Sequence, residues 1–239
     1  MKKLLALCLL LPLFGLSQTK NVVSVTRVFP KIDKVGEFEK ALTAHAQKYH
    51  TGDWKWRVFT IESGPDAGGY HITEGPVSWE QIDGRGDLGQ AHTDDWNKNV
   101  AVYLTDKYQS SYSVFREDLS TVQLTDYSDK IAILHIFPKP GFGLKMEEHL
   151  KNVKKAWEIG KETVAAYQAS SSGPSQFALV SRYKGGLKER ATGFRKPFNE
   201  RYEEANGAGS YNNYAENVSK YTDNSWSELL FYKKELSSK

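Results

Sequence analysis

Cysteine is nearly absent from this sequence. Of the 239 residues only one, Cys8, is a cysteine, and it lies inside an apolar N-terminal run. Once that run is removed, no cysteine remains to form a disulfide, to act as a thiolate nucleophile or to bind a metal. Stability must then come from the burial of apolar side chains, and a chain of this length can bury a core of sufficient size.

The one long apolar run extends from Leu4 to Leu16 and follows two lysines, Lys2 and Lys3. It is shorter than the roughly 20 apolar residues that a membrane-spanning helix needs. A basic start, a short apolar run and a small residue such as Ser17 are typical of a secretory signal peptide. We therefore expect residues 1–17 to be a signal peptide and the mature protein to be periplasmic or extracellular, without membrane attachment. An uncleaved N-terminal anchor is the alternative.

The sequence also lacks an excess of charge of one sign, since its formal net charge is +3. Basic residues are mixed with acidic ones, as in residues 151–162, a pattern typical of a solvated helix face. Nucleic-acid binding usually requires a segregated basic surface, so the composition argues against a nucleic-acid partner.

Short catalytic motifs are absent as well. The sequence contains no His-Glu-x-x-His zinc motif, no Cys-x-x-Cys pair, no Gly-x-Ser-x-Gly nucleophile motif and no glycine-rich nucleotide loop in its proper context. We therefore expect no metal site, and no cofactor is predicted from local motifs. The function has to be inferred from the arrangement of residues in the fold.

What the sequence does contain is an internal duplication. Residues 23–34 and 131–143 are both strand-like and both include Phe-Pro-Lys, beginning at Phe29 and at Phe137, an offset of 108 residues. Ser-Gly-Pro recurs at 63–65 and 172–174, and the pattern of 110–120 recurs at 227–237. A repeat this long indicates a domain-sized unit used twice, because solenoid repeats are far shorter.

Each half has the same predicted order of elements: strand, helix, two strands of a hairpin, helix, strand. In the first half the strands are expected at 21–29, 54–62, 70–74 and 110–117, and the second helix carries Leu88, His92, Trp96, Val100 and Tyr103 at helical spacing. In the second half the strands are expected at 131–137, 163–170, 176–183 and 227–237, with helices at 144–158 and 211–221. A glycine-rich, charged segment, 184–210, precedes the last helix.

This order is that of the split β-α-β-β-α-β, ferredoxin-like unit, whose sheet has helices on one face only. The other face needs a cover, and in a duplicated chain the sister sheet supplies it. We therefore predict an α+β fold in which two ferredoxin-like units pack sheet to sheet as an intramolecular α/β barrel, so that no oligomer is required. The first unit spans 21–120, a connection spans 121–129 and the second unit spans 130–237.

On this duplication and element order, residues 21–237 resemble a tandem member of the dimeric α/β-barrel superfamily. That superfamily includes antibiotic-biosynthesis-type monooxygenases, haem-degrading monooxygenases, chlorite-dismutase-like proteins and NIPSNAP-like proteins. The resemblance implies that a ligand lies between the two sheets. It also implies that haem is a conceivable cofactor, because some haem-binding members present an axial histidine from a helix that faces the cavity.

Five residues are candidates for ligand binding: Arg27, Arg57, His92, Tyr103 and His135. Arg27 and His135 hold equivalent positions in the two halves, and an arginine buried without a partner beneath helices would be very costly. Since strand side chains alternate between faces, we expect both to face the space between the sheets. Exposed positions without a role are the alternative. The resemblance makes His92 the candidate haem ligand, and a packed core histidine is the alternative.

Three functions follow from these patterns. The first is a secreted or periplasmic protein that binds a small apolar or aromatic molecule between its sheets. The second is a monooxygenase, either cofactor-independent or haem-dependent. The third is a non-catalytic structural or cell-envelope interaction protein whose barrel is filled by side chains.

Overall fold

The computed structural model of this chain describes residues 19–171 and 173–239. The expected signal peptide, residues 1–17, lies outside the described residues, as does Ser172 of the second Ser-Gly-Pro turn. Among the described residues, no helix combines the length and the apolar character that crossing a bilayer requires.

Both halves follow the predicted order of elements. The first half contains β1 (Val22–Pro30), α1 (Val35–Tyr49), β2 (Trp56–Ser63), β3 (Tyr70–Val77), α2 (Trp79–Asp83), α3 (Gln90–Asp95) and β4 (Leu104–Phe115). The second half contains β5 (Lys130–Pro138), α4 (Gly143–Ile159), β6 (Val164–Ala169), β7 (Phe177–Arg182), α5 (Phe198–Asn206), α6 (Ser210–Tyr221) and β8 (Thr222–Tyr232). The predicted α+β class and the duplicated unit are confirmed.

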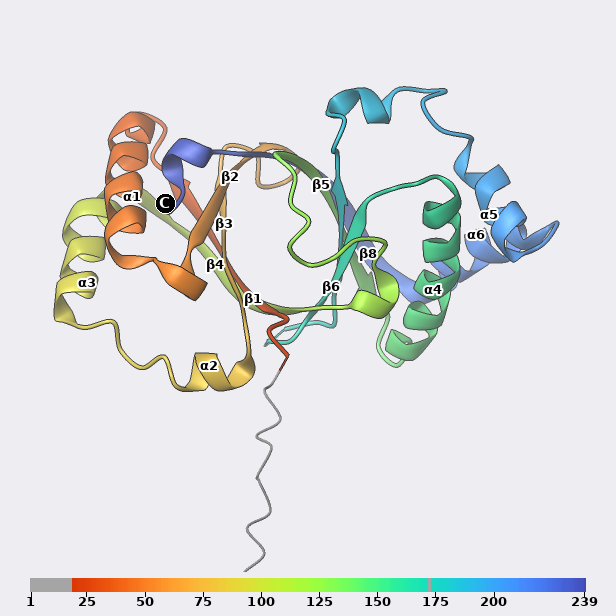
Figure 1. Cartoon of the computed structure of the whole chain (residues 1–239), viewed down its shortest axis with the longest axis horizontal. Coiled ribbons are helices and arrows are strands. Elements are labelled where there is room, and N and C mark those ends of the chain that lie inside the picture. Colours follow the sequence, from red (N-terminus) through yellow and green to blue (C-terminus); the bar gives the residue numbers. More distant parts are fainter. Residues whose placement is uncertain (1–18, 172) are drawn as a thin grey trace, which may run out of the picture.

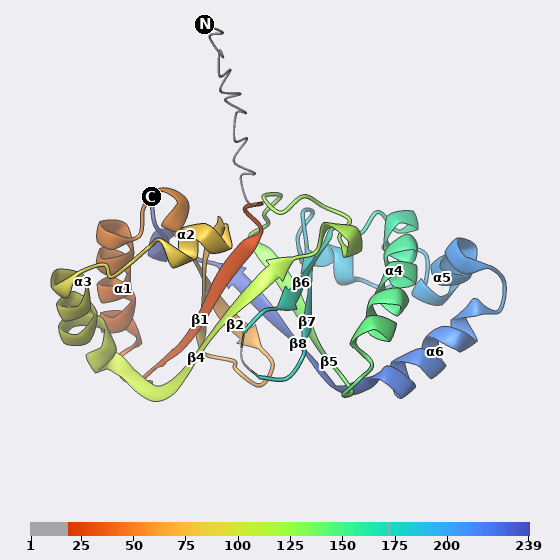
Figure 2. The ribbon, with the colours of Figure 1, turned by 90° about the horizontal axis from the view of Figure 1, so that it is seen from below.

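The strands of the two halves join into one closed barrel, in the order β1-β3-β2-β8-β5-β7-β6-β4. All neighbouring strands are antiparallel. Helices α1 to α3 lie outside one side of this barrel and α4 to α6 lie outside the opposite side (Figures 1 and 2). The sheets therefore enclose a common interior, as the sequence predicted, and they do so by pairing at both junctions.

Strands β4 and β8 close the barrel because each runs from its own half into the other. β4 pairs with β1 and then with β6, and β8 pairs with β5 and then with β2. Both strands begin earlier than the sequence predicted, at Leu104 and at Thr222. The extra residues are largely exposed and polar, so hydrophobic periodicity did not mark them as strand.

A short 3₁₀ turn after each of these strands packs into the core of the opposite half. Leu119 follows β4 and is fully buried in the core of the second half, and Leu236 follows β8 and is buried in the core of the first. Burying one leucine side chain contributes about 1.5–3 kcal/mol. These two contacts explain why the patterns of 110–120 and 227–237 match.

The serine after each leucine ties the turn to the partner half. The Ser120 hydroxyl accepts a hydrogen bond from the Ala166 amide at 2.8 Å, and the Ser237 hydroxyl accepts one from the Val58 amide at 3.0 Å. Each serine therefore satisfies a backbone amide that would otherwise lie buried without a partner. The duplicated Leu-Ser pairs have the same role in both halves.

Each helix layer has its own core on the outer face of the barrel. In the first half Phe38 and Leu42 of α1 pack against Val58, Tyr70 and Ile72 of the sheet. In the second half the corresponding helix stripe packs against Phe177 and Leu179, and it comprises Met146, Leu150, Val153 and Trp157. These helix stripes are therefore core positions.

Two sequence expectations need correction. The second helix of the first half is interrupted, since α3 ends at Asp95 and a π-helical turn, Trp96–Val100, follows it. That turn contains Asn97 and Asn99, and asparagine favours caps and turns over helix interiors. The charged segment 184–210 is also partly helical, because it includes α5, whose Tyr202 packs against the core of the second half.

His149 of α4 is a buried histidine in this outer core, stacked on Tyr214 at a ring-centroid distance of 5.1 Å. Its Nδ1 has no hydrogen-bond partner among the described residues. Burial lowers the pKa of His149 to about 4, because no partner stabilises its charged form.

The low pKa of His149 predicts a loss of stability in mild acid. The unfolded chain takes up a proton near pH 6.5 and the folded chain does not, so the free energy of unfolding falls by about 2 kcal/mol between pH 7 and pH 5 through this residue alone. Chemical denaturation of wild type and His149→Phe at both pH values isolates this contribution from the other histidines. Equal losses in the two proteins would contradict the prediction.

Candidate functional site: the interior of the barrel

The barrel encloses a cavity of about 330 Å³. Side chains from both halves and from the connection between them line it, and these include Val23, Val25, Arg27, Arg57, Phe59, His71, Thr73, Gln109, Leu124, Tyr127, Ile131, Ile133, His135, Tyr167, Gln176, Val180, Arg182 and Trp226. An interior filled by side chains, as the purely structural alternative supposes, is therefore disfavoured.

The strand register brings Arg27 and His135 to the same level of the cavity. Arg27 lies opposite His71 on β3 and opposite Gln109 on β4, and His135 lies opposite Trp226 on β8. All five side chains line the cavity. The predicted orientation of Arg27 and His135 is confirmed, because the period-2 alternation of strands holds in both halves.

A buried carboxylate, Glu228 of β8, joins these two residues. Its side chain is completely buried and accepts hydrogen bonds from both terminal nitrogens of Arg27, one of them at 3.0 Å. His135 Nε2 lies 2.8 Å from Glu228 Oε1. Glu228 thus links β1, β5 and β8 across the two halves.

The acceptors around His135 define its tautomer. A carboxylate only accepts, so Nε2 carries a proton toward Glu228, and Nδ1 is free to accept from the Gln176 side-chain amide at 2.6 Å. Arg27 Nη2 lies 3.5 Å from His135 Nε2, but both are donors, and they share Glu228 as a common acceptor. The His135 ring also stacks on Trp226 at 3.9 Å between centroids.

Two carboxylates compensate the charge of Arg27. Besides Glu228, Arg27 contacts Asp66 at 2.8 Å, and Asp66 contacts Lys107 at 2.7 Å. Burial alone would raise the pKa of Asp66, but hydrogen bonds from Lys107 and Arg27 lower it below its usual value. Two cations therefore face two carboxylates, and Arg27 does not offer an unpaired positive charge to an anionic ligand.

The β2–β3 turn places Asp66 in this network. Gly64, in that turn, has φ +102°, and a Cβ added to it would lie 2.9 Å from the Cβ of Glu228. Only glycine combines this backbone conformation with so close an approach to β8. The Ser-Gly-Pro turn noted in the sequence is thus part of the site's support.

Arg57 is a cavity cation with neither a carboxylate partner nor a side-chain hydrogen bond to the described residues, whereas Arg182, which also lacks a carboxylate, donates to carbonyl oxygens. Its guanidinium lies over the Tyr127 ring, 3.6 Å from the centroid, and 4.9 Å from that of Tyr232. Its Nε is buried and makes no hydrogen bond to the described residues. Aromatic faces hold the guanidinium in place and leave its donors available to a ligand.

The connection between the halves forms one wall of the cavity. Leu124, Tyr127 and Ser128 line it. Arg182 holds this segment: its two terminal nitrogens donate to the carbonyl oxygens of Gln123, Leu124 and Asp126 at 2.6–3.1 Å and to the Tyr167 hydroxyl at 3.0 Å. In Figure 1 the connection crosses the space between the two halves of the barrel.

His71 also faces the cavity, on β3. Its Nδ1 is buried and has no partner in the described part of the chain. Burial lowers the pKa of His71 well below its usual value, and the nearby charges of Arg27 and His135 act in the same direction. At neutral pH this ring is therefore uncharged.

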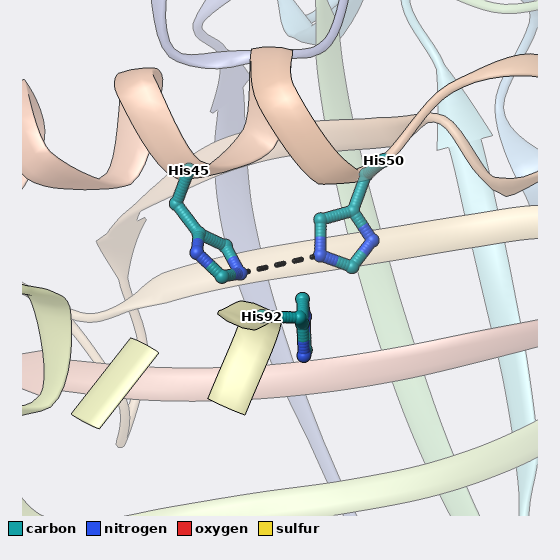
Figure 3. A group of neighbouring side chains, drawn as sticks. All are labelled: His45, His50 and His92. Atoms are coloured by element: carbon teal, nitrogen blue, oxygen red, sulfur yellow. Dashed lines mark hydrogen bonds between the residues drawn. The ribbon is translucent and has the colours of Figure 1, made fainter. Parts of the chain in front are cut away.

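The other two candidates, His92 and Tyr103, lie outside the barrel. Tyr103 packs against the outer core of the first half. His92 lies next to His45, which belongs to α1, and next to His50, which directly follows α1 (Figure 3). His92 lies on α3 and Tyr103 in a separate 3₁₀ turn, Ala101–Tyr103, and both elements lie over the outer face of the sheet.

Sequence reasoning missed Glu228 and Asp66. A sequence signal for Glu228 exists. Because side chains alternate between the two faces of a strand, Glu228 shares a face with Trp226 and Leu230, and Leu230 is fully buried. Asp66 lies in a turn, where an aspartate is ordinary, and no local pattern marks its contact with Arg27.

Comparison with solved structures identifies the fold. The chain superposes on a "putative monooxygenase" from Fusobacterium nucleatum subsp. nucleatum with a TM-score of 0.55 and 14% identity, over 89% of this chain and 92% of that one. An anthrone oxidase-like protein gives a TM-score of 0.57 at 10% identity, over 90% of this chain and 92% of that one. No family model matches the sequence, and no curated protein does either.

A heme-binding protein from Thermus thermophilus matches with a TM-score of 0.50 and 9% identity, over 90% of this chain and 92% of that one. The fold of this chain is therefore that of these solved structures, here a closed barrel with helices on its outer faces. At these identities the likeness establishes architecture, and the activity has to be argued from the site.

The buried network predicts a strong dependence of stability on Glu228. Glu228→Gln keeps the shape but removes the charge that compensates Arg27, so we expect a loss of about 3–5 kcal/mol in the free energy of unfolding. The exposed ion-pair residue Glu158 is the control, since Glu158→Gln should cost less than about 1 kcal/mol. Denaturant titration measures both. A Glu228→Gln protein as stable as wild type would show that the network contributes nothing.

Proposed function

We propose that this protein binds a small, largely apolar or aromatic molecule inside its barrel, and that an oxygen of this molecule accepts hydrogen bonds from Arg57. The observation that carries this proposal is the guanidinium of Arg57, which lines the cavity without a carboxylate partner among the described residues. Ligand pockets are usually apolar with a few placed polar groups, and this cavity has that composition.

The polar groups of the cavity differ in what they can offer. Arg27 and His135 are already paired with Glu228. Arg182 is occupied by the carbonyl groups of the connection. Among the arginines and histidines that line the cavity, Arg57 and His71 remain with unused hydrogen-bonding capacity. A ligand therefore meets the donors of one guanidinium and one neutral imidazole.

The apolar walls favour a flat ring system. Phe59, Ile131, Ile133 and Val180 contribute apolar surface, and Trp226 contributes a ring that already stacks on His135. Aromatic pairs add about 0.5–1.5 kcal/mol beyond the area they bury. An aromatic ligand uses these walls better than a flexible polar one does.

The proposal also covers the location of the protein and its binding partners. Residues 1–17 have the pattern of a signal peptide, so the site functions in the periplasm or outside the cell. One chain supplies both halves of the barrel, and binding therefore needs no second copy. Neither a nucleic acid nor a membrane is part of the proposed function.

A second candidate function is that of a monooxygenase, and His71 favours it. The neutral imidazole of His71, which lines the same cavity as Arg57, can accept a proton from an acidic ligand while Arg57 stabilises the negative charge that remains. The names of two of the structural neighbours support the same chemistry. The haem-dependent form would need an axial ligand, and His92, the residue considered for that role, lies outside the cavity.

The binding proposal predicts a preference for an anionic aromatic ligand over a neutral one. Wild type should bind 2-naphthoate more tightly than naphthalene, and Arg57→Gln should lose about 1.5–3 kcal/mol of naphthoate binding, or roughly 10- to 150-fold in Kd. Calorimetric titration measures both ligands.

Two controls keep this test decisive. Lys151→Gln removes one exposed charge from α4 and should leave naphthoate binding unchanged. Naphthalene should bind equally to wild type and Arg57→Gln, which shows that the cavity of the variant is intact. If naphthoate does not discriminate between wild type and Arg57→Gln, Arg57 is not the ligand-binding group.

The monooxygenase candidate predicts oxygen consumption with anthrone, a probe suggested by the name of one neighbour. His71→Phe should lower the rate about 10²- to 10⁴-fold, the usual contribution of a general base, while retaining 2-naphthoate binding. An oxygen electrode and product absorbance follow the reaction. Wild-type consumption no faster than in buffer would leave binding as the function.

A further inference from the structure

Three histidines from two separate elements converge outside the barrel. His45 belongs to α1, His50 directly follows α1, and His92 belongs to α3. One ring nitrogen of each lies within 4.8 Å of the corresponding nitrogens of the other two. Figure 3 shows the three rings close to one another, with the contact between His45 and His50 drawn as a dashed line.

The hydrogen bonds of the outer ring nitrogens orient these rings. His45 Nδ1 lies 2.7 Å from Asp95 Oδ2, and His50 Nδ1 lies 2.9 Å from Glu74 Oε2. Because a carboxylate accepts, each Nδ1 carries the proton, and each Nε2 of a neutral ring presents a lone pair. These two Nε2 atoms face one another at 3.4 Å.

His92 adds a third nitrogen to this pair. Its Nε2 is buried and has no hydrogen-bond partner among the described residues. A buried polar atom of this kind usually has a partner, and a bound ion is one such partner. The candidate ligand nitrogens of the three histidines lie within 4.8 Å of one another.

The carboxylates behind the histidines are themselves held. Glu74 accepts from Arg85 Nη2 at 2.9 Å and from the Trp56 indole at 2.9 Å, and Asp95 accepts from Asn99 at 2.9 Å. Metal-ligating histidines commonly donate their second nitrogen to a carboxylate that is fixed in this way. The Trp56 ring also stacks on His50, 3.6 Å between centroids, and restricts its orientation.

We propose that His45, His50 and His92 bind a divalent transition-metal ion, with Zn²⁺ as the best fit. Zinc–nitrogen bonds of about 2.0–2.1 Å in a tetrahedron place two nitrogens about 3.3 Å apart, close to the distance between the His45 and His50 nitrogens. Imidazole ligands without thiolates suit Zn²⁺, Cu²⁺ or Ni²⁺ and disfavour Mg²⁺ and Ca²⁺.

Three protein ligands leave a fourth position for water or a small ligand. His92 is only half-buried, and Tyr49, which packs against both His45 and His92, also lines a surface pocket together with Arg85 and Leu88. This pocket gives the ion a route from solvent. The ion would also fasten α3 to α1, since each helix supplies a ligand.

The site is separate from the barrel cavity. Glu74 lies on the outer face of β3, whereas its neighbour Thr73 lines the cavity. The metal proposal and the proposed ligand-binding function can therefore be tested and rejected independently of each other.

Metal titration of the purified, tag-free chain after chelator treatment tests the proposal. Zn²⁺ should bind with one ion per chain, and Co²⁺ should give the visible absorption of a tetrahedral nitrogen site. Glu74→Gln should weaken Zn²⁺ binding about 10- to 100-fold through the orientation of His50. His92→Ala should weaken it further and abolish the Co²⁺ spectrum.

His149→Phe is the matched control, because it removes a buried histidine outside the cluster and should leave one high-affinity site. The wild-type Co²⁺ spectrum supports the proposal without any variant, so a misfolded variant does not decide the outcome. Failure of wild type to bind Zn²⁺ or Co²⁺ would overturn the proposal. Binding that persists unchanged in His92→Ala would also overturn it, since surface groups would then be the ligands.

Discussion

The pairing of each half's last strand with the edge strand of the other half is the constraint on which this structure depends. A ferredoxin-like sheet alone leaves one face and two edges uncovered. Here β8 pairs with β2 and β4 pairs with β6, so both edges are used and both inner faces meet. Leu119 and Leu236 then fill the core of the half opposite their own. Neither half is complete without the end of the other.

Barrel closure also decides the electrostatics of the interior. Glu228 comes from β8 and lies close to His135 of the neighbouring strand β5, but it meets Arg27 of β1 only because the strands close around a common space. A buried charge needs a partner of opposite sign. Since Glu228 and Asp66 satisfy Arg27, the unused cationic capacity of the cavity falls to Arg57.

Strand β3 separates two regions of different chemistry. Its residues His71 and Thr73 face the cavity, and Glu74 faces the helices, where it orients His50. Because side chains alternate along β3, one face of this strand lines the barrel cavity and the other face supports the histidine cluster. The π-helical turn after α3 lies next to this cluster, and such turns are frequent near functional sites.

The sequence by itself determined the duplicated unit, the strand and helix order and the inward direction of Arg27 and His135, because these depend on periods of two and 3.6 residues within short segments. It did not reveal α5 or the early starts of β4 and β8, where polar residues hide the periodicity. Only the tertiary structure decided that Glu228 and Asp66 compensate Arg27. It alone brought His92 to His45 and His50, since contacts between distant segments depend on how helices and strands pack.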